Sequence, residues 1–106
     1  MSEEQKRVIG SMDELISEWD ERSRSRAPFS FVKNKLSRRS DLCAMLILDK
    51  LCPGDSKVIS YVSDDEIRFG IELEKLVGVI STDDISDLCA CGVFLVEREE
   101  YIGMFV

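Results

Sequence analysis

The sequence predicts a small α+β domain, in which helices pack on a mainly antiparallel sheet that is built from two hairpins. Two helical patterns come first along the chain, and two hairpin patterns follow, with short helical segments between them. This order differs from the strict strand–helix–strand alternation that is typical of parallel sheets. Because 106 residues suffice for one hydrophobic core, we expect a single domain over 1–106, with 1–10 flexible.

The first helix is expected to begin after Ser11, because Ser11-Met12-Asp13-Glu14 has the S-x-x-E form of a capping box. Leu15, Ile16 and Trp19 then fall on one side at helical spacing, and acidic residues occupy much of the other side. The pattern predicts a short amphipathic helix with an acidic outer face.

The second helix, over 41–52, is apolar on almost every side, and Ser37 or Ser40 is expected to cap it. A helix of this kind must be covered on more than one face. We therefore expect it to be the buried centre of the domain, with Leu46 and Ile47 in the core, or else to form a subunit interface in a homodimer.

The second half of the chain alternates between turn residues and β-formers, which is typical of hairpins. Between the two hairpins, short helices are expected over 72–79 and from Ser81 or Thr82 to Gly92, where a left-handed residue is favoured. The predicted strands and turns are, in order, 58–62, 63–65, 66–71, 93–96, 97–100 and 101–106.

Two common features of enzyme active sites are missing from this sequence. It has no histidine, which is the commonest acid–base group at neutral pH, and no glycine-rich phosphate-binding pattern. Cys43, Cys52, Cys89 and Cys91 are poorly spaced for a tetrahedral metal ion and are expected to be reduced structural thiols. We therefore expect a protein that is not an enzyme and has no cofactor or metal; a carboxylate- and metal-dependent enzyme is the least favoured alternative.

Charge is divided unevenly along the chain. Residues 22–40 contain seven basic and no acidic residues, whereas the remainder, with seven basic and 21 acidic residues, carries −14. Acidic residues in the two hairpin turns are therefore predicted to meet a basic surface on a partner protein. These candidate partner-binding residues are Asp64, Asp65, Glu99 and Glu100.

An alternative function uses the basic segment 22–40 to bind nucleic acid or a small ligand. Arginine side chains there could grip phosphates, although the acidic remainder would repel a polyanion. The candidate residues for this alternative are Arg22, Arg24, Arg26, Arg38 and Arg39.

The sequence lacks the features that mark membrane-spanning and exported proteins. No run approaches the roughly 20 apolar residues that span a bilayer, and the charged N-terminus has no apolar stretch after it. We expect a cytoplasmic protein with no membrane contact.

Several short stretches resemble small uncharacterised accessory proteins of tailed bacteriophages. The stretches are Leu36-Ser37-Arg38-Arg39-Ser40-Asp41-Leu42-Cys43, Leu48-Asp49-Lys50-Leu51, Pro53-Gly54, Asp65-Glu66-Ile67, Cys91-Gly92-Val93 and Met104-Phe105-Val106. That family has no assigned activity, so no site residue follows from it. The resemblance implies a non-enzymatic protein in the cytoplasm of an infected bacterial host, which binds and inhibits a host or defence factor.

Overall fold

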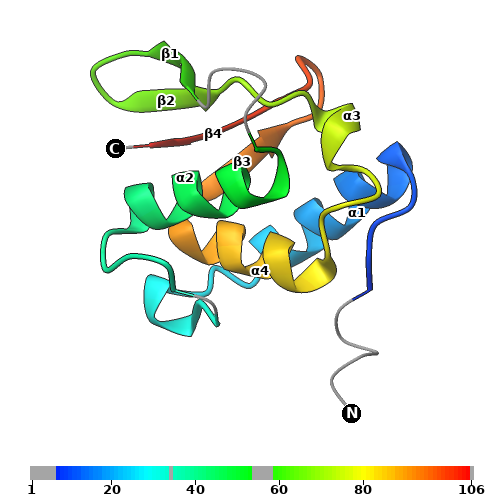
Figure 1. Cartoon of the computed structure of the whole chain (residues 1–106), viewed down its shortest axis with the longest axis horizontal. Helices are drawn as coiled ribbons and strands as arrows, with labels where there is room; N and C mark the ends of the chain where they lie inside the picture. Colours follow the sequence, from blue (N-terminus) through cyan, green and yellow to red (C-terminus); the bar gives the residue numbers. More distant parts are fainter. Residues whose placement is uncertain (1–6, 34, 54–58, 106) are drawn as a thin grey trace.

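The computed structural model describes residues 7–33, 35–53 and 59–105. It confirms a small α+β domain in which the main helices cover one face of a four-stranded antiparallel sheet (Figure 1). The elements are α1 (Met12–Ser23), the 3-10 turn η2 (Phe29–Phe31), α2 (Ser40–Leu51), β1 (Ile59–Val62), β2 (Glu66–Phe69), α3 (Leu73–Leu76), α4 (Thr82–Cys91), β3 (Val93–Val96) and β4 (Tyr101–Phe105). Within the described residues, no helix has the length and apolar character needed to cross a membrane.

The ends of α1 and α4 follow the local sequence signals. The Ser11 hydroxyl accepts a hydrogen bond from the Glu14 amide at 3.2 Å and caps α1. At the start of α4, Ser81 and Asp84 form a reciprocal capping box. Gly92 ends α4 with φ +99°, the left-handed conformation that glycine adopts without strain.

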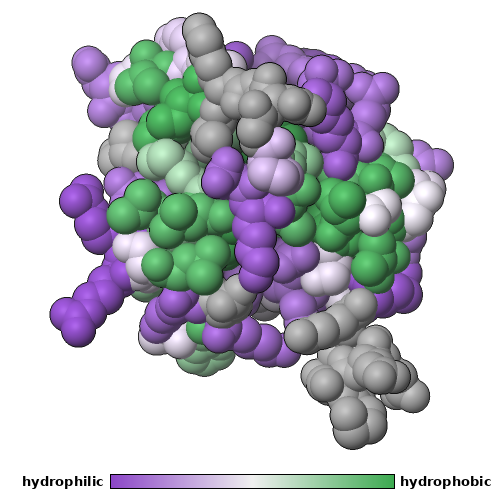
Figure 2. All heavy atoms as spheres, in the orientation of Figure 1, coloured by the Kyte–Doolittle hydropathy of each residue, from purple (hydrophilic) through white to green (hydrophobic). Residues whose placement is uncertain are grey.

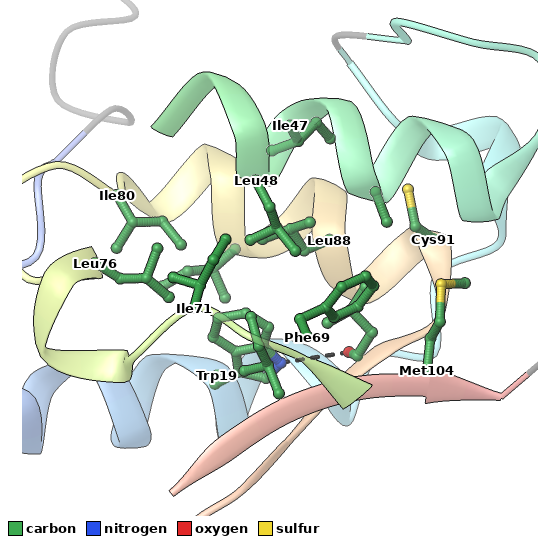
Figure 3. Packing of buried hydrophobic residues seen from close by; sticks show 14 of the residues in the cluster. Trp19, Ile47, Leu48, Phe69, Ile71, Leu76, Ile80, Leu88, Cys91 and Met104 are labelled. Carbon is green, nitrogen blue, oxygen red and sulfur yellow. Dashed lines mark hydrogen bonds between the residues drawn. The ribbon is translucent and has the colours of Figure 1, made fainter. Parts of the chain in front are cut away.

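The sheet has the strand order β1-β2-β4-β3, so the two predicted hairpins are joined through β2 and β4. Ile67 of β2 lies opposite Met104 of β4, and Leu95 of β3 lies opposite Ile102. Because side chains alternate along a strand, these residues and Phe69 point toward the helices. Figure 3 shows Phe69 and Met104 packed under the helical layer.

The predicted position of the second helix is wrong. Six of the ten residues of α4 are buried, and α4 contacts both α1 and α2. α2 is on the outside of the layer: Ile47 and Leu48 are buried, but Leu42 and Leu46 are 43% and 37% exposed. Only one side of α2 meets the core, so its outward leucines stay in contact with solvent, and Figure 2 shows apolar side chains gathered over this helix.

Two other local predictions also need correction. Arg39 occupies the N-cap of α2 and makes no side-chain cap, so neither Ser37 nor Ser40 plays that part. The helix expected over 72–79 is the single turn α3, because Val77 is already extended and Gly78 has φ +92°.

The segment from Arg7 to Gly10, which was expected to be flexible, is docked on the domain. The Ile9 amide donates to the Ile80 carbonyl at 2.9 Å, and the Gly78 amide donates to the Ile9 carbonyl at 2.8 Å. The Ile9 side chain is fully buried. The rest of the predicted flexible stretch, 1–6, lies outside the described residues.

Candidate functional site

The face of the sheet that points away from the helices carries a row of side chains across all four strands. Tyr61 of β1 lies opposite Arg68 of β2, Arg68 lies opposite Gly103 of β4, and Gly103 lies opposite Phe94 of β3. Strand alternation places four more side chains on the same face. We call this surface the open face, and it consists of Tyr61, Glu66, Arg68, Phe94, Val96, Tyr101, Gly103 and Phe105.

Arg68 is held in the middle of the open face by two aromatic rings. Its guanidinium carbon lies 4.3 Å from the ring centre of Tyr101 and 5.2 Å from that of Tyr61. Its Nε is shielded from solvent and lies 3.5 Å from a Glu66 carboxylate oxygen. Tyr101 donates its hydroxyl hydrogen to the same carboxylate at 3.2 Å. Cation–π and ionic contacts therefore fix Arg68 in one position on the sheet.

Phenylalanine rings occupy the other half of the open face. The ring centres of Phe94 and Phe105 are 5.0 Å apart, and Phe94 meets Tyr101 edge-on at 6.5 Å. Phe105 is 68% exposed and Tyr61 is 51% exposed. Exposed aromatic side chains thus lie on either side of the charged residues of β2, and exposed apolar surface is one mark of interaction sites on soluble proteins.

Gly103 keeps the centre of the open face flat. A Cβ at this position would lie 2.6 Å from the Ile67 carbonyl oxygen, much closer than atoms tolerate. It would also lie 3.4 Å from the Phe94 ring and 3.5 Å from the Tyr101 ring. Glycine therefore permits the close approach of β2 and β4 and leaves a shallow floor between the aromatic rings.

The pKa of Tyr101 is raised above its ordinary value, first by desolvation and then by the carboxylates of Glu66 and Glu99. The positive charge of Arg68 opposes this shift. The raised pKa makes the phenol a weaker acid than an ordinary tyrosine, so it remains a hydrogen-bond donor to higher pH.

The acidic residues of the two hairpin turns are all exposed, as turn residues usually are. Asp64 and Asp65 precede β2, whose first residue lies opposite Phe105 at the end of β4. Glu99 and Glu100 instead precede the first residue of β4. The two acidic turns, Asp64 with Asp65 and Glu99 with Glu100, thus lie at opposite ends of the strands, on either side of the open face (Figure 1).

The basic segment is partly paired with acidic side chains within the protein. Four of its seven cations have acidic partners, and Arg26 and Arg38 are exposed. Arg22 also donates to the Ser86 hydroxyl at 2.8 Å, which ties the end of α1 to α4. The ion pairs are Arg22–Glu18 at 3.0 Å, Arg24–Asp20 at 2.8 Å, Lys33–Asp83 at 3.5 Å and Arg39–Asp41 at 3.6 Å. The cations of three of these pairs are largely exposed, so the pairs weaken the positive charge of the segment without removing it.

The cysteine thiols lie in different places. Cys43 of α2 and Cys91 of α4 are buried neighbours between the two helices, whereas the Cys52 thiol points to the Lys75 carbonyl. Burial raises the pKa of both Cys89 and Cys91 to about 12. Within the described part of the chain, no three or more Cys, Asp or Glu side chains are grouped so that they could hold a metal ion.

Sequence reasoning identified the acidic turns but missed the open face between them. The available signal was the alternation in β4, where Tyr101, Gly103 and Phe105 share one side and Ile102 and Met104 the other. No protein-family model, curated protein or solved structure matches this chain.

Proposed function

We propose that this protein is a non-enzymatic binding protein, and that the open face with its two acidic turns docks on a basic surface of a partner protein. The observation that carries this proposal is the row Tyr61, Arg68, Gly103 and Phe94, which no described helix covers. Tyrosine and arginine are the residue types most often found at the energetic centres of protein interfaces.

The parts of the site have different roles in binding. The rings of Tyr61 and Phe105 supply exposed apolar area that a partner can bury. Arg68 is already ordered by its neighbours, so little side-chain entropy is lost when a partner contacts it. The acidic turns guide a basic partner toward the face, an effect that raises the association rate more than the final affinity.

The resemblance to phage accessory proteins indicates what kind of partner this protein would bind and what effect the binding would have. A small acidic protein that covers a basic groove would block that groove for its usual substrate. Inhibition of a host or defence factor in the bacterial cytoplasm is therefore the form of binding that we propose.

A nucleic-acid ligand is the second candidate, because an aromatic sheet face can stack unpaired bases. The residues around the open face oppose it: Glu66 lies on the face itself, and acidic turns lie at both ends. A steep fall in single-stranded DNA or RNA binding with added salt would support this candidate.

Self-association is a further alternative, through the outward side of α2. Leu42 and Leu46 would be covered in such a homodimer. Light scattering at two protein concentrations, with melting temperatures at the same concentrations, separates a dimer from a monomer.

The test of the proposed function uses association and dissociation rates. A partner is first isolated by pull-down from host lysate, and its binding is then measured at two ionic strengths. Reversing Asp64, Asp65, Glu99 and Glu100 to lysine should slow association by about tenfold or more at low salt. Phe105→Ala should instead speed dissociation, because it removes buried contact area.

The matched control reverses four exposed acidic residues on the helical side, namely Asp13, Glu21, Asp49 and Glu74. It changes the net charge by the same amount away from the open face and should slow association much less. Equal effects of the two sets would contradict the proposal. A loss of binding on replacement of Arg26 and Arg38 by alanine, with tighter binding after the acidic reversals, would favour the polyanion alternative.

A further inference from the structure

A groove of about 360 Å³ lies between α1 and β3, beside the open face. Ile16 and Asp20 line it from α1, and Phe94, Leu95 and Glu97 line it from β3 and the following turn. Among the strands of the described residues, β3 pairs with β4 alone and therefore lies at an edge of the sheet. The groove is thus bounded on one side by strand backbone that is not paired within the sheet.

A contact with Trp19 indicates which way the backbone C=O and N–H groups of β3 are directed. The indole Nε1 of Trp19 donates to the Val93 carbonyl at 3.4 Å, and Figure 3 draws Trp19 with this hydrogen bond as a dashed line. Because Trp19 belongs to α1, we infer that this carbonyl is directed to α1 and not to β4. In an antiparallel strand the backbone groups of alternate residues point the same way. The N–H and C=O of Leu95 are therefore directed into the groove, while those of Phe94 and Val96 face β4.

The two edges of the sheet differ in a way that matters for pairing. β1, at one edge, has a register shift between Ile59 and Tyr61, and irregularities of this kind discourage another strand from pairing there. β3 pairs with β4 in unbroken register from Val93 to Val96. β3 therefore has no bulge of the kind that discourages a further strand from pairing.

We infer that the groove binds an extended segment of the partner protein, which adds to β3 as a fifth strand. This inference rests on the proposed function and specifies the form that the partner takes. Phe94 links the two surfaces, because its ring lines the groove and also packs against Phe105 on the open face. A partner seated on the open face can therefore continue into the groove without a break.

The lining of the groove defines the chemistry of the segment. Ile16, Leu95 and Phe94 offer apolar contacts to alternate side chains of an added strand. Asp20 and Glu97 place carboxylates beside them, and the Asp20–Arg24 pair is too exposed to cancel that charge. The segment should therefore alternate apolar residues with lysine or arginine.

The test uses a hexapeptide of alternating lysine and valine, with a glutamate and valine hexapeptide as its charge-reversed counterpart. The full-length protein is labelled with ¹⁵N and titrated with each peptide. With the basic peptide, the Leu95 amide and the Trp19 indole signals should shift, and hydrogen exchange at Leu95 should slow by about tenfold through its new hydrogen bond. The acidic peptide should leave these signals unchanged.

Two variants on α1 provide the matched comparison. Asp20→Lys should weaken binding of the basic peptide by about tenfold, because it replaces a groove carboxylate with a cation. Glu21→Lys makes the same charge change on an exposed neighbour that does not line the groove, and it should leave the affinity nearly unchanged.

The results separate this inference from the proposed function. Unchanged Leu95 and Trp19 signals at millimolar basic peptide, or equal losses from the two variants, would overturn the groove assignment. In that case the rates of the Phe105→Ala and acidic-turn variants would still decide whether the open face binds a partner. If those rates match the rates of the unaltered protein while the groove binds the peptide, the assignment of the open face as a binding surface is wrong and the groove assignment is supported.

Discussion

Replacing Leu88 by alanine should lower the free energy of unfolding by about 2–5 kcal/mol, the range for truncating a fully buried leucine. Leu88 has no exposed surface, and it lies in α4 between Leu48 of α2 and Phe69 of the sheet (Figure 3). These neighbours belong to different elements and cannot all collapse into the cavity. A cost near the upper part of the range is expected for that reason.

Leu46→Ala makes the same chemical change on the outward side of α2. Because Leu46 is 37% exposed, less buried area is lost and no closed cavity forms. Its cost should stay below about 1.5 kcal/mol. The difference between the two variants therefore measures which helix is the centre of the domain.

Urea unfolding followed by tryptophan fluorescence provides the assay. Trp19 is the only tryptophan, is 2% exposed, and packs against β3, so its emission reports on the whole core. In thermal melts, each 1 kcal/mol should lower the midpoint by about 4–8 °C for a domain of this size. If Leu46→Ala costs as much as Leu88→Ala, α2 is more deeply packed than the structure indicates, and the assignment of α4 as the central helix is wrong.

Two further predictions concern the sheet and the thiols. Gly103→Ala should destabilise the protein far more than Gly10→Ala. The new Cβ would lie 2.6 Å from a backbone oxygen at Gly103, but 3.7 Å from a flexible carboxylate at Gly10. Similar melting temperatures for the two variants would contradict the close approach of β2 and β4. The free energy of unfolding should fall as the pH rises from about 9 toward 12. Cys89 and Cys91 have pKa values of about 12 in the folded protein, against an ordinary value of 9.0. The thiols of the unfolded chain therefore lose their protons first, which stabilises the unfolded state. Urea unfolding of the chain and of a Cys89→Ala, Cys91→Ala variant between pH 8 and 11 checks this, and equal slopes with pH would show that these thiols do not cause the loss.

The two hairpins, the start of α1 and both ends of α4 could be predicted from the sequence because their signals are local. The strand Val93–Val96 and the turn over 97–100 occur where the pattern predicted them. The cap at Ser81 and the left-handed Gly92 also follow from chemistry within a few residues. Neither feature depends on how distant parts of the chain pack.

The burial of the helices could not be predicted in this way. α2 is richer in apolar residues than α4, yet α4 is more deeply buried, because burial depends on the position of a helix within its layer. Asp87 illustrates the difficulty: it is 4% exposed in α4, and its carboxylate accepts a hydrogen bond from the Lys33 amide at 2.9 Å. These two residues are 54 positions apart, so no local pattern shows that this carboxylate has a buried donor.

Only part of the candidate site could be predicted from the sequence, for the same reason. The acidic turns belong to single hairpins, but the row from Tyr61 to Phe94 exists only because β2 pairs with β4 and joins the hairpins. That pairing also separates the turns, since the five residues of β4 span about 14 Å. This separation exceeds the Debye length of about 8 Å at physiological salt, so each turn steers a partner largely on its own. A partner that responds to both turns must therefore present basic groups at two places, and the aromatic rings between them are the surface that it would cover.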